Sequence, residues 1–174
     1  MMMNPTTFDP VMIRNVCSKT YLDMFVHMIP SVELWEDEEQ IAEEDYDKIN
    51  LTKLNLIEHG HFKNPVLAGI AIGLMSQIYD AGGKDYFTPE IHFCGISVKD
   101  KSTKVNLHTD NWDENKLKIL GILNSDWDNR QDGGGFIYED MSYSLQPMNF
   151  LIFDSRQTAS IYRRRAAWHK SGVC

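Results

Sequence analysis

The sequence predicts an α+β fold, with helices in the first half and a β-sheet core in the second. Apolar residues recur at helical spacing in two stretches before residue 83. After Gly83 the pattern changes to short strands, separated by turn-forming clusters such as KDKST and SDWDNRQDGGG. Helices followed by a run of strands are typical of an antiparallel barrel or a double-sheet jelly roll packed on helices.

Two stretches of the first half have helical patterns with capping signals. Ser18 is a candidate N-cap for a helix that stops before Pro30, and residues 11–16 precede it as a short strand. A second helix is expected to begin at Asn64-Pro65, because Pro is favoured in the first turn after a capping residue. It should end at the glycines that follow Ala81.

Residues 33–47 carry nine acidic side chains. This stretch is either a docking surface for a basic partner or, on the simpler reading, a solvated helix face or linker.

The second half reads as a series of short apolar segments. They are expected as strands at 89–97, 104–108, 117–124, 134–138, 148–153 and 158–163. The length of 174 residues suits a single domain over 1–174. Residues 1–83 would then form a mainly helical lead-in, and 84–174 the jelly-roll core.

Composition excludes several classes of protein. A formal net charge of −8 argues against general nucleic-acid binding, which needs a basic face to offset phosphate charge. The longest apolar stretch, 66–75, is too short to cross a bilayer, and the N-terminus has no signal-peptide pattern. The three cysteines (Cys17, Cys94 and Cys174) are odd in number and form no CxxC pair, so we expect no disulfide framework and a reducing, cytoplasmic compartment.

The most informative motif is His108-Thr109-Asp110, where a predicted strand gives way to a polar loop. Side chains two residues apart on an extended chain lie on the same side, so the imidazole and the carboxylate can reach one metal ion. With a distant imidazole they would form the facial triad of non-haem Fe(II) oxygenases. Taken alone, an H-x-D pair is also common as an incidental surface feature.

The segments that follow the H-x-D pair occur in a recognisable order. A strand ending in Leu-Asn is followed by an acidic turn with a Trp, a Gly-Gly strand and a Pro-x-x-x-Leu-x-x-Phe strand. These elements are Leu123-Asn124, Asp126-Trp127, Gly133-Gly134-Gly135-Phe136 and the segment from Pro147 to Phe153. In this order the chain resembles the prolyl-4-hydroxylase-like 2-oxoglutarate/Fe(II) dioxygenases, and in particular the small members carried by phages.

The resemblance implies a function and a set of ligands. It implies Fe(II) as cofactor, 2-oxoglutarate as co-substrate, and hydroxylation of a protein side chain or a small molecule. Substrate would enter over the loop after His108, where Trp112 could stack on it, as could Trp127 beyond the next strand; either Trp could instead pack its own loop down. A phage-type member would work in the cytoplasm of its host.

The chain departs from the family pattern at its C-terminus. The distal metal-binding His is expected at position 159, where this sequence has Ala159. Three readings remain open. His169 could be the distal ligand, leaving almost no chain for the closing strand; His108 and Asp110 could hold the metal alone; or the tail could be aberrant, leaving a jelly roll without iron turnover.

The family also places an Arg or Lys on the closing strand, where it pairs with the distal carboxylate of 2-oxoglutarate. Arg163 or Arg165 is the nearest substitute, although both could simply be exposed charges. Two other histidine patterns are weaker: His59-Gly60-His61 resembles a metal-binding pair but is expected to be a loop, and His92 could face a co-substrate pocket or belong to the core or surface.

The sequence is therefore compatible with two functions. The first is a 2-oxoglutarate/Fe(II)-dependent dioxygenase. The alternative is a catalytically inactive jelly-roll binding module that lacks the distal His.

Overall fold

The structure is a computed structural model that describes residues 8–29, 36–40, 49–99, 117–132, 135–138, 140–154, 159–162 and 169–173. Within these ranges the helical segments are α1 (Lys19–Met28), α2 (Pro65–Asp80), α3 (Asn129–Asp132) and the 3₁₀ turn η2 (Gly83–Asp85). The strands before residue 100 are β1 (Val11–Ile13), β2 (Glu36–Gln40), β3 (Ile49–Glu58), β4 (His61–Phe62) and β5 (Phe93–Lys99). The later strands are β6 (Leu117–Ile122), β7 (Gly135–Tyr138), β8 (Met141–Ser144), β9 (Phe150–Asp154), β10 (Ala159–Tyr162) and β11 (His169–Val173).

The two long helices begin where the sequence predicts. The Ser18 side chain accepts a hydrogen bond from the backbone N–H of Tyr21 at 3.1 Å, and Asn64 does the same for Leu67 at 3.1 Å. Each cap satisfies an N–H group that has no partner inside its own helix. None of the helices in the described ranges is long and apolar enough to cross a membrane.

A hydrogen bond from one tyrosine joins the two helices. The hydroxyl of Tyr21 on α1 donates to the backbone carbonyl of Ile70 on α2 at 2.8 Å. Gly73 provides the space for this contact, since a Cβ atom at that position would lie 2.9 Å from the Tyr21 oxygen. A residue larger than glycine would push the tyrosine away from α2.

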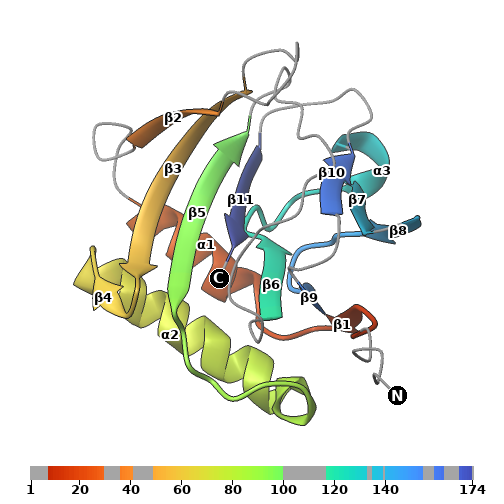
Figure 1. Ribbon diagram of the computed structural model, residues 1–174, viewed down its shortest axis with the longest axis horizontal. Coiled ribbons are helices and arrows are strands. Elements are labelled where there is room, and N and C mark those ends of the chain that lie inside the picture. Colours follow the sequence, from red (N-terminus) through yellow and green to blue (C-terminus); the bar gives the residue numbers. More distant parts are fainter. Residues whose placement is uncertain are drawn as a thin grey trace, which may run out of the picture.

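The strands form two antiparallel sheets (Figure 1). The large sheet has eight described strands in the order β1-β9-β6-β11-β5-β3-β2, with β4 paired to β3. The small sheet has the order β10-β7-β8.

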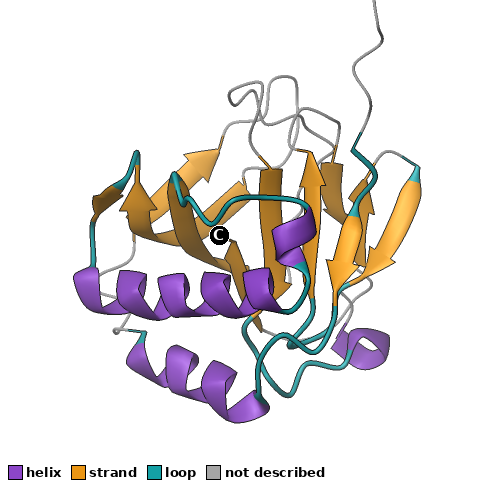
Figure 2. Cartoon of the chain, turned by 90° about the horizontal axis from the view of Figure 1, so that it is seen from below, coloured by secondary structure: helices purple, strands orange, loops and turns teal. Residues whose placement is uncertain are grey.

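The molecule has three layers, with the helices below the large sheet in Figure 2. One core lies between α1, α2 and the helix-facing side of the large sheet, and it includes Leu22, Leu56 and Ile152. The second core joins the other side of the large sheet to the small sheet through residues such as Leu151, Phe136 and Tyr138. Alternate residues of β9 contribute to the two cores in turn, as the pleat of a strand requires.

The prediction of a mainly helical lead-in over 1–83 is wrong in the region between the two helices. Residues 49–58 form the long strand β3, and 36–40 in the acidic stretch form β2 beside it instead of a helix. A β-bulge between Asn55 and Ile57 interrupts the alternation of β3 and makes Leu56 and Ile57 consecutive buried residues. That interruption hides the strand from a search for period-two patterns.

The sequence left open whether a strand forms near the C-terminus. Residues 169–173 form β11, which inserts between β5 and β6 in the middle of the large sheet. Its sequence, HKSGV, has one strongly apolar residue, so hydrophobic patterning gives no signal for it. Pairing of its backbone with two neighbours holds it in the sheet. The predicted strand 158–163 is confirmed as β10, whereas 104–108 lies outside the described residues.

The two described cysteines differ from each other in their bonding. Cys17 is a free thiol, but Cys94 on β5 is fully buried and disulfide-bonded. The sequence contains no signal for this bond, because it predicts only that a disulfide framework is absent.

Candidate functional site

Five of the seven predicted site residues lie outside the described residues, namely His108, Asp110, Trp112, Arg163 and Arg165. The two candidate positions for the distal ligand are both in strands. Ala159 is the first residue of β10 and pairs with Tyr138 in the small sheet, whereas His169 is the first residue of β11 and pairs with Lys99 in the large sheet. The two positions therefore belong to different sheets, and His169 does not occupy the position where the pattern expects a histidine.

Trp127 has a structural role. Its side chain is only 8% exposed and belongs to the core between the sheets. The expectation that it stacks on a substrate is not supported, because a ring buried among Leu120, Ile122 and Phe136 is not available to one. Its backbone N–H donates to Asn124 at 3.2 Å, which closes the turn after β6.

The inner face of the large sheet, which we define as the side opposite the helices, is apolar over β6 and β9. Leu120 and Ile122 on β6 and Leu151 and Phe153 on β9 all belong to the core between the sheets. The Phe153 ring lies 4.8 Å from that of Phe136 and 5.5 Å from that of Tyr138. This half of the interior is filled by side-chain packing.

The same face is polar over β3 and β5. Leu54 and Ile96 are opposite each other and belong to the helix-side core. Because side chains alternate along a strand, their neighbours lie on the inner face. These neighbours are the paired residues Asn55 and Gly95, and Lys53 and Ser97. We call these four residues the polar row.

One member of the polar row is not explained by packing. The Oδ1 atom of Asn55 is buried and finds no hydrogen-bond partner in the described part of the chain. Gly95 opposite it is buried beneath the Phe93 ring, since a Cβ atom there would lie 3.3 Å from that ring and 3.5 Å from the Asn55 oxygen. A buried polar atom without a partner costs free energy, so such atoms often mark a place where a ligand or water is bound.

Sequence reasoning does not identify the polar row. The only signal is the polar residues between the leucines of 49–58, and that segment falls within the expected helical lead-in.

β11 connects the polar and apolar halves. Position 171 pairs with Ser97 of the polar row on one side and with Ile122 of the apolar half on the other. The last strand therefore runs along the boundary where a small molecule would meet both kinds of surface.

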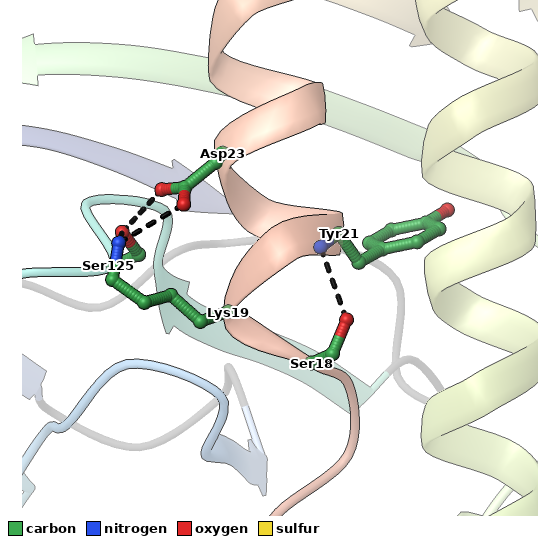
Figure 3. Close-up of polar contacts among 5 residues, drawn as sticks. All are labelled: Ser18, Lys19, Tyr21, Asp23 and Ser125. Carbon is green, nitrogen blue, oxygen red and sulfur yellow. Dashed lines mark hydrogen bonds and ion pairs between the residues drawn. The ribbon is translucent and has the colours of Figure 1, made fainter.

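A polar cluster joins α1 to the turn after β6 (Figure 3). Lys19 Nζ donates to Asp23 and to Ser125 at 2.9 and 2.8 Å, and the Ser125 hydroxyl donates to Asp23. The hydrogen bond from Ser125, followed by that from Lys19, holds the pKa of the Asp23 carboxyl below its ordinary value. The cluster is exposed, and it positions the turn that contains Trp127.

Two of the histidines outside the H-x-D motif, one in the turn between β3 and β4 and one just before β5, lie close together. His59 Nδ1 and His92 Nε2 are 3.2 Å apart, and the backbone N–H of Gly60 donates to the His92 carbonyl at 3.1 Å. No group of three metal-ligating side chains occurs among the described residues. His61, next along the chain, is exposed.

Solved structures share this fold at low sequence identity. An oxidoreductase of the 2OG-Fe(II) oxygenase family from Burkholderia pseudomallei matches with a TM-score of 0.69 and 16% identity, over 94% of this chain and 83% of that one. The prolyl hydroxylase of Trichoplax adhaerens, solved with a fragment of the oxygen degradation domain of hypoxia inducible factor, matches with a TM-score of 0.64 and 14% identity, over 94% and 81%.

A viral protein matches over a similar extent. The viral collagen prolyl hydroxylase of Paramecium Bursaria Chlorella virus-1, solved with 2OG, gives a TM-score of 0.61 and 8% identity, over 94% of this chain and 93% of that one. No family model and no curated protein sequence matches this chain. The comparisons establish a fold like that of the 2-oxoglutarate/Fe(II) oxygenases.

Proposed function

We propose that this chain is a 2-oxoglutarate/Fe(II)-dependent dioxygenase of the prolyl-4-hydroxylase-like type. The observation that carries the proposal is the strand arrangement, in which β9-β6-β11-β5 faces β10-β7-β8. We interpret these strands as the two sheets of a jelly roll. The matches to solved oxygenases over at least 94% of this chain support that interpretation.

The donor chemistry fits iron at two positions. The His108 imidazole and the Asp110 carboxylate would hold Fe(II), since nitrogen and oxygen donors in an H-x-D pair are two-thirds of a facial triad. Ala159 contributes no donor atom, so the third position would be filled by His169 or by a molecule from solution. The metal would therefore be bound more weakly than by a complete triad.

The polar row fits a co-substrate that is bound through water. The unsatisfied Oδ1 of the buried Asn55 amide is an acceptor and 2-oxoglutarate has no donor, so a bridging water would donate to both. Lys53 lies in the same row and would offset the charge of a carboxylate. Arg163 and Arg165 remain predicted partners of the distal carboxylate of 2-oxoglutarate.

The chemistry would combine these parts. Bound Fe(II) and 2-oxoglutarate would supply the oxidising power that hydroxylates a C–H bond of the substrate. The chain's own contribution would be to orient the co-substrate along β11 and to exclude water with the apolar half of the interior. Trp112 would lie in the loop over which the substrate enters.

The substrate class is proposed from chemistry shared with the matched structures. Two of them are prolyl hydroxylases, and one of these two was solved in complex with a peptide fragment. We therefore propose a protein side chain as substrate, with a small molecule as the other outcome of a substrate screen. The net charge of −8 supports a non-nucleic-acid partner, and we propose that the protein acts in the cytoplasm.

Anaerobic titration tests the iron site directly. Fe(II) is added to the purified protein with 2-oxoglutarate present, and the visible charge-transfer band of the chelate is recorded. We expect a saturable band that disappears in His108→Ala and in Asp110→Ala. His61→Ala, which removes an exposed imidazole on β4, is the matched control and should retain the band.

A further variant tests which ligand fills the third coordination position of the proposed iron site. Loss of the band in His169→Ala would assign the third donor to that residue. An unchanged band would mean that His108 and Asp110 bind the metal with ligands from solution.

Ala159 favours a second candidate function, an inactive jelly-roll binding module without the distal His. This module would give no band at any iron concentration, although 2-oxoglutarate could still bind. Absence of the band from the wild-type protein would therefore overturn the dioxygenase proposal and leave the binding module.

A further inference from the structure

The turn between β3 and β4 contains a histidine that the turn itself does not require. The central residues of this hairpin are His59 and Gly60, and both have positive φ, at 50° and 76°. Positive φ at both central residues is typical of a type I′ turn, in which Asn-Gly is a favoured pair. An asparagine would therefore suit the first position at least as well, and the turn does not account for the imidazole of His59.

Backbone pairing places a second histidine opposite the first. Glu58 at the end of β3 pairs with Phe93 at the start of β5. The next residues in the same register are His59 and His92, and the backbone N–H of Gly60 donates to the His92 carbonyl at 3.1 Å. Opposed residues of antiparallel strands have Cβ atoms about 4.5–5.5 Å apart, so the main chain holds the two imidazoles close together.

The distance between the facing ring nitrogens suits a single metal ion. His59 Nδ1 and His92 Nε2 are 3.2 Å apart, and the two ring planes are inclined at 81°. Two imidazole nitrogens bound to a tetrahedral Zn²⁺ at about 2.0–2.1 Å are themselves about 3.3–3.4 Å apart. The pair therefore has nearly the spacing of two zinc ligands.

The surroundings of the pair leave the other coordination positions to water. The side chain of His59 is exposed and that of His92 is half-buried, so an ion can reach both from solvent. The carboxylate of Glu58, the residue before His59, forms an ion pair with Lys63 at 2.9 Å. We therefore count two protein donors at this site.

We propose that His59 and His92 bind a Zn²⁺ ion, with water completing a tetrahedral site. Imidazole nitrogen suits zinc and its neighbours copper and nickel, whereas Mg²⁺ and Ca²⁺ prefer oxygen ligands. The ion replaces the N–H···N hydrogen bond that the two rings can form without it. Because His59 belongs to the β3–β4 hairpin and His92 precedes β5, the bound ion cross-links the hairpin to the start of β5.

Calorimetric titration of the full chain with Zn²⁺ alone tests the site. The titration is made on the double variant His108→Ala/Asp110→Ala, which lacks the two predicted iron ligands. We expect one zinc ion per chain, and an affinity that falls by at least about tenfold when His59→Asn or His92→Ala is added. His59→Asn introduces a residue that the turn favours, so a loss of binding in this variant is not a consequence of misfolding.

The same substitutions in the wild-type background keep the test valid if the double variant does not fold. His59→Asn and His92→Ala should each remove one bound zinc ion per chain, whether or not the iron site exists. His61→Ala, which removes the neighbouring exposed imidazole, is the matched control and should bind as many ions as the wild type. Unchanged binding in His59→Asn or in His92→Ala would overturn the proposal. Loss of the ion in His61→Ala with binding retained in His92→Ala would also overturn it, since the ligands would then be sequence neighbours.

Thermal unfolding tests the cross-link. At a free Zn²⁺ concentration of 100 times Kd, an ion that binds only the folded chain should raise the Tm of the double variant by roughly 5 °C or more. The rise should be below about 2 °C once His59→Asn is added. Equal shifts with and without His59→Asn would refute the cross-link. These readouts need neither iron nor 2-oxoglutarate, so they stand apart from the proposed enzymatic function.

Discussion

The two faces of the large sheet differ in chemistry along the same strands. On the helix side, Leu54, Leu56, Cys94 and Ile96 are buried against α1 and α2. On the inner face, the residues between them are Asn55, Gly95 and Ser97. A sheet that only needed stability would be apolar on both covered faces. The difference leaves polar residues on the inner face of β3 and β5, which is where we propose that the co-substrate binds.

Removing apolar volume from the helix-side core should reduce the stability of the fold more than the other substitutions described below. Leu56 is fully buried, so Leu56→Ala should lower the free energy of unfolding by about 2–5 kcal/mol through lost burial and the cavity left behind. Urea denaturation measures the change. Phe62→Ala is the control, since that side chain is 59% exposed and its loss should cost less than about 0.5 kcal/mol. Equal losses in the two variants would contradict the assignment of the core to the helix side.

Removing the amide from the polar row should change stability much less. Asn55→Ala deletes a buried oxygen that has no partner in the described part of the chain, so the free energy of unfolding should stay within about 1 kcal/mol of the wild-type value. The affinity for 2-oxoglutarate, measured by calorimetry, should fall. A loss of stability of more than about 2 kcal/mol, with affinity unchanged, would make Asn55 a structural residue.

A substitution in the exposed cluster between α1 and the turn after β6 should change the stability of the fold least. Asp23→Asn should lower the Tm by about 2 °C at pH 7, because the cluster is open to solvent. Since the folded-state pKa of Asp23 is lowered, its contribution is present above the unfolded value of about 3.9 and is lost as the pH falls through the folded value. The Tm difference between the variant and the wild type should therefore shrink below about pH 4. A constant difference down to pH 2 would show that the charge of Asp23 is not involved.

The elements that sequence predicts correctly are those whose signals are local. Ser18 and Asn64 cap their helices as expected, and the apolar segment 117–122 is a strand with apolar residues facing both cores. Such features need only capping chemistry and periodicity. These local signals predict the two long helices and about half of the described strands.

The elements that sequence misses depend on distant partners. The β-bulge in β3 breaks its alternation, and β11 is a strand because β5 and β6 leave a gap between them. The polar row becomes visible only when β3 and β5 are paired, since Asn55 and Gly95 are 40 positions apart in the sequence. The H-x-D motif stays a sequence prediction.

The position of β11 has a consequence for synthesis of the protein. β5 and β6 emerge from the ribosome well before the strand that lies between them. At roughly 5–20 residues per second, the ~47 residues from the end of β6 to the start of β11 take about 2–9 s to translate. During that interval one edge of β5 and at least one edge of β6 have unpaired backbone groups, which other chains could bind, because β9 is also still to be translated for part of it. The nascent protein is therefore most exposed to aggregation in the seconds before its last strand arrives.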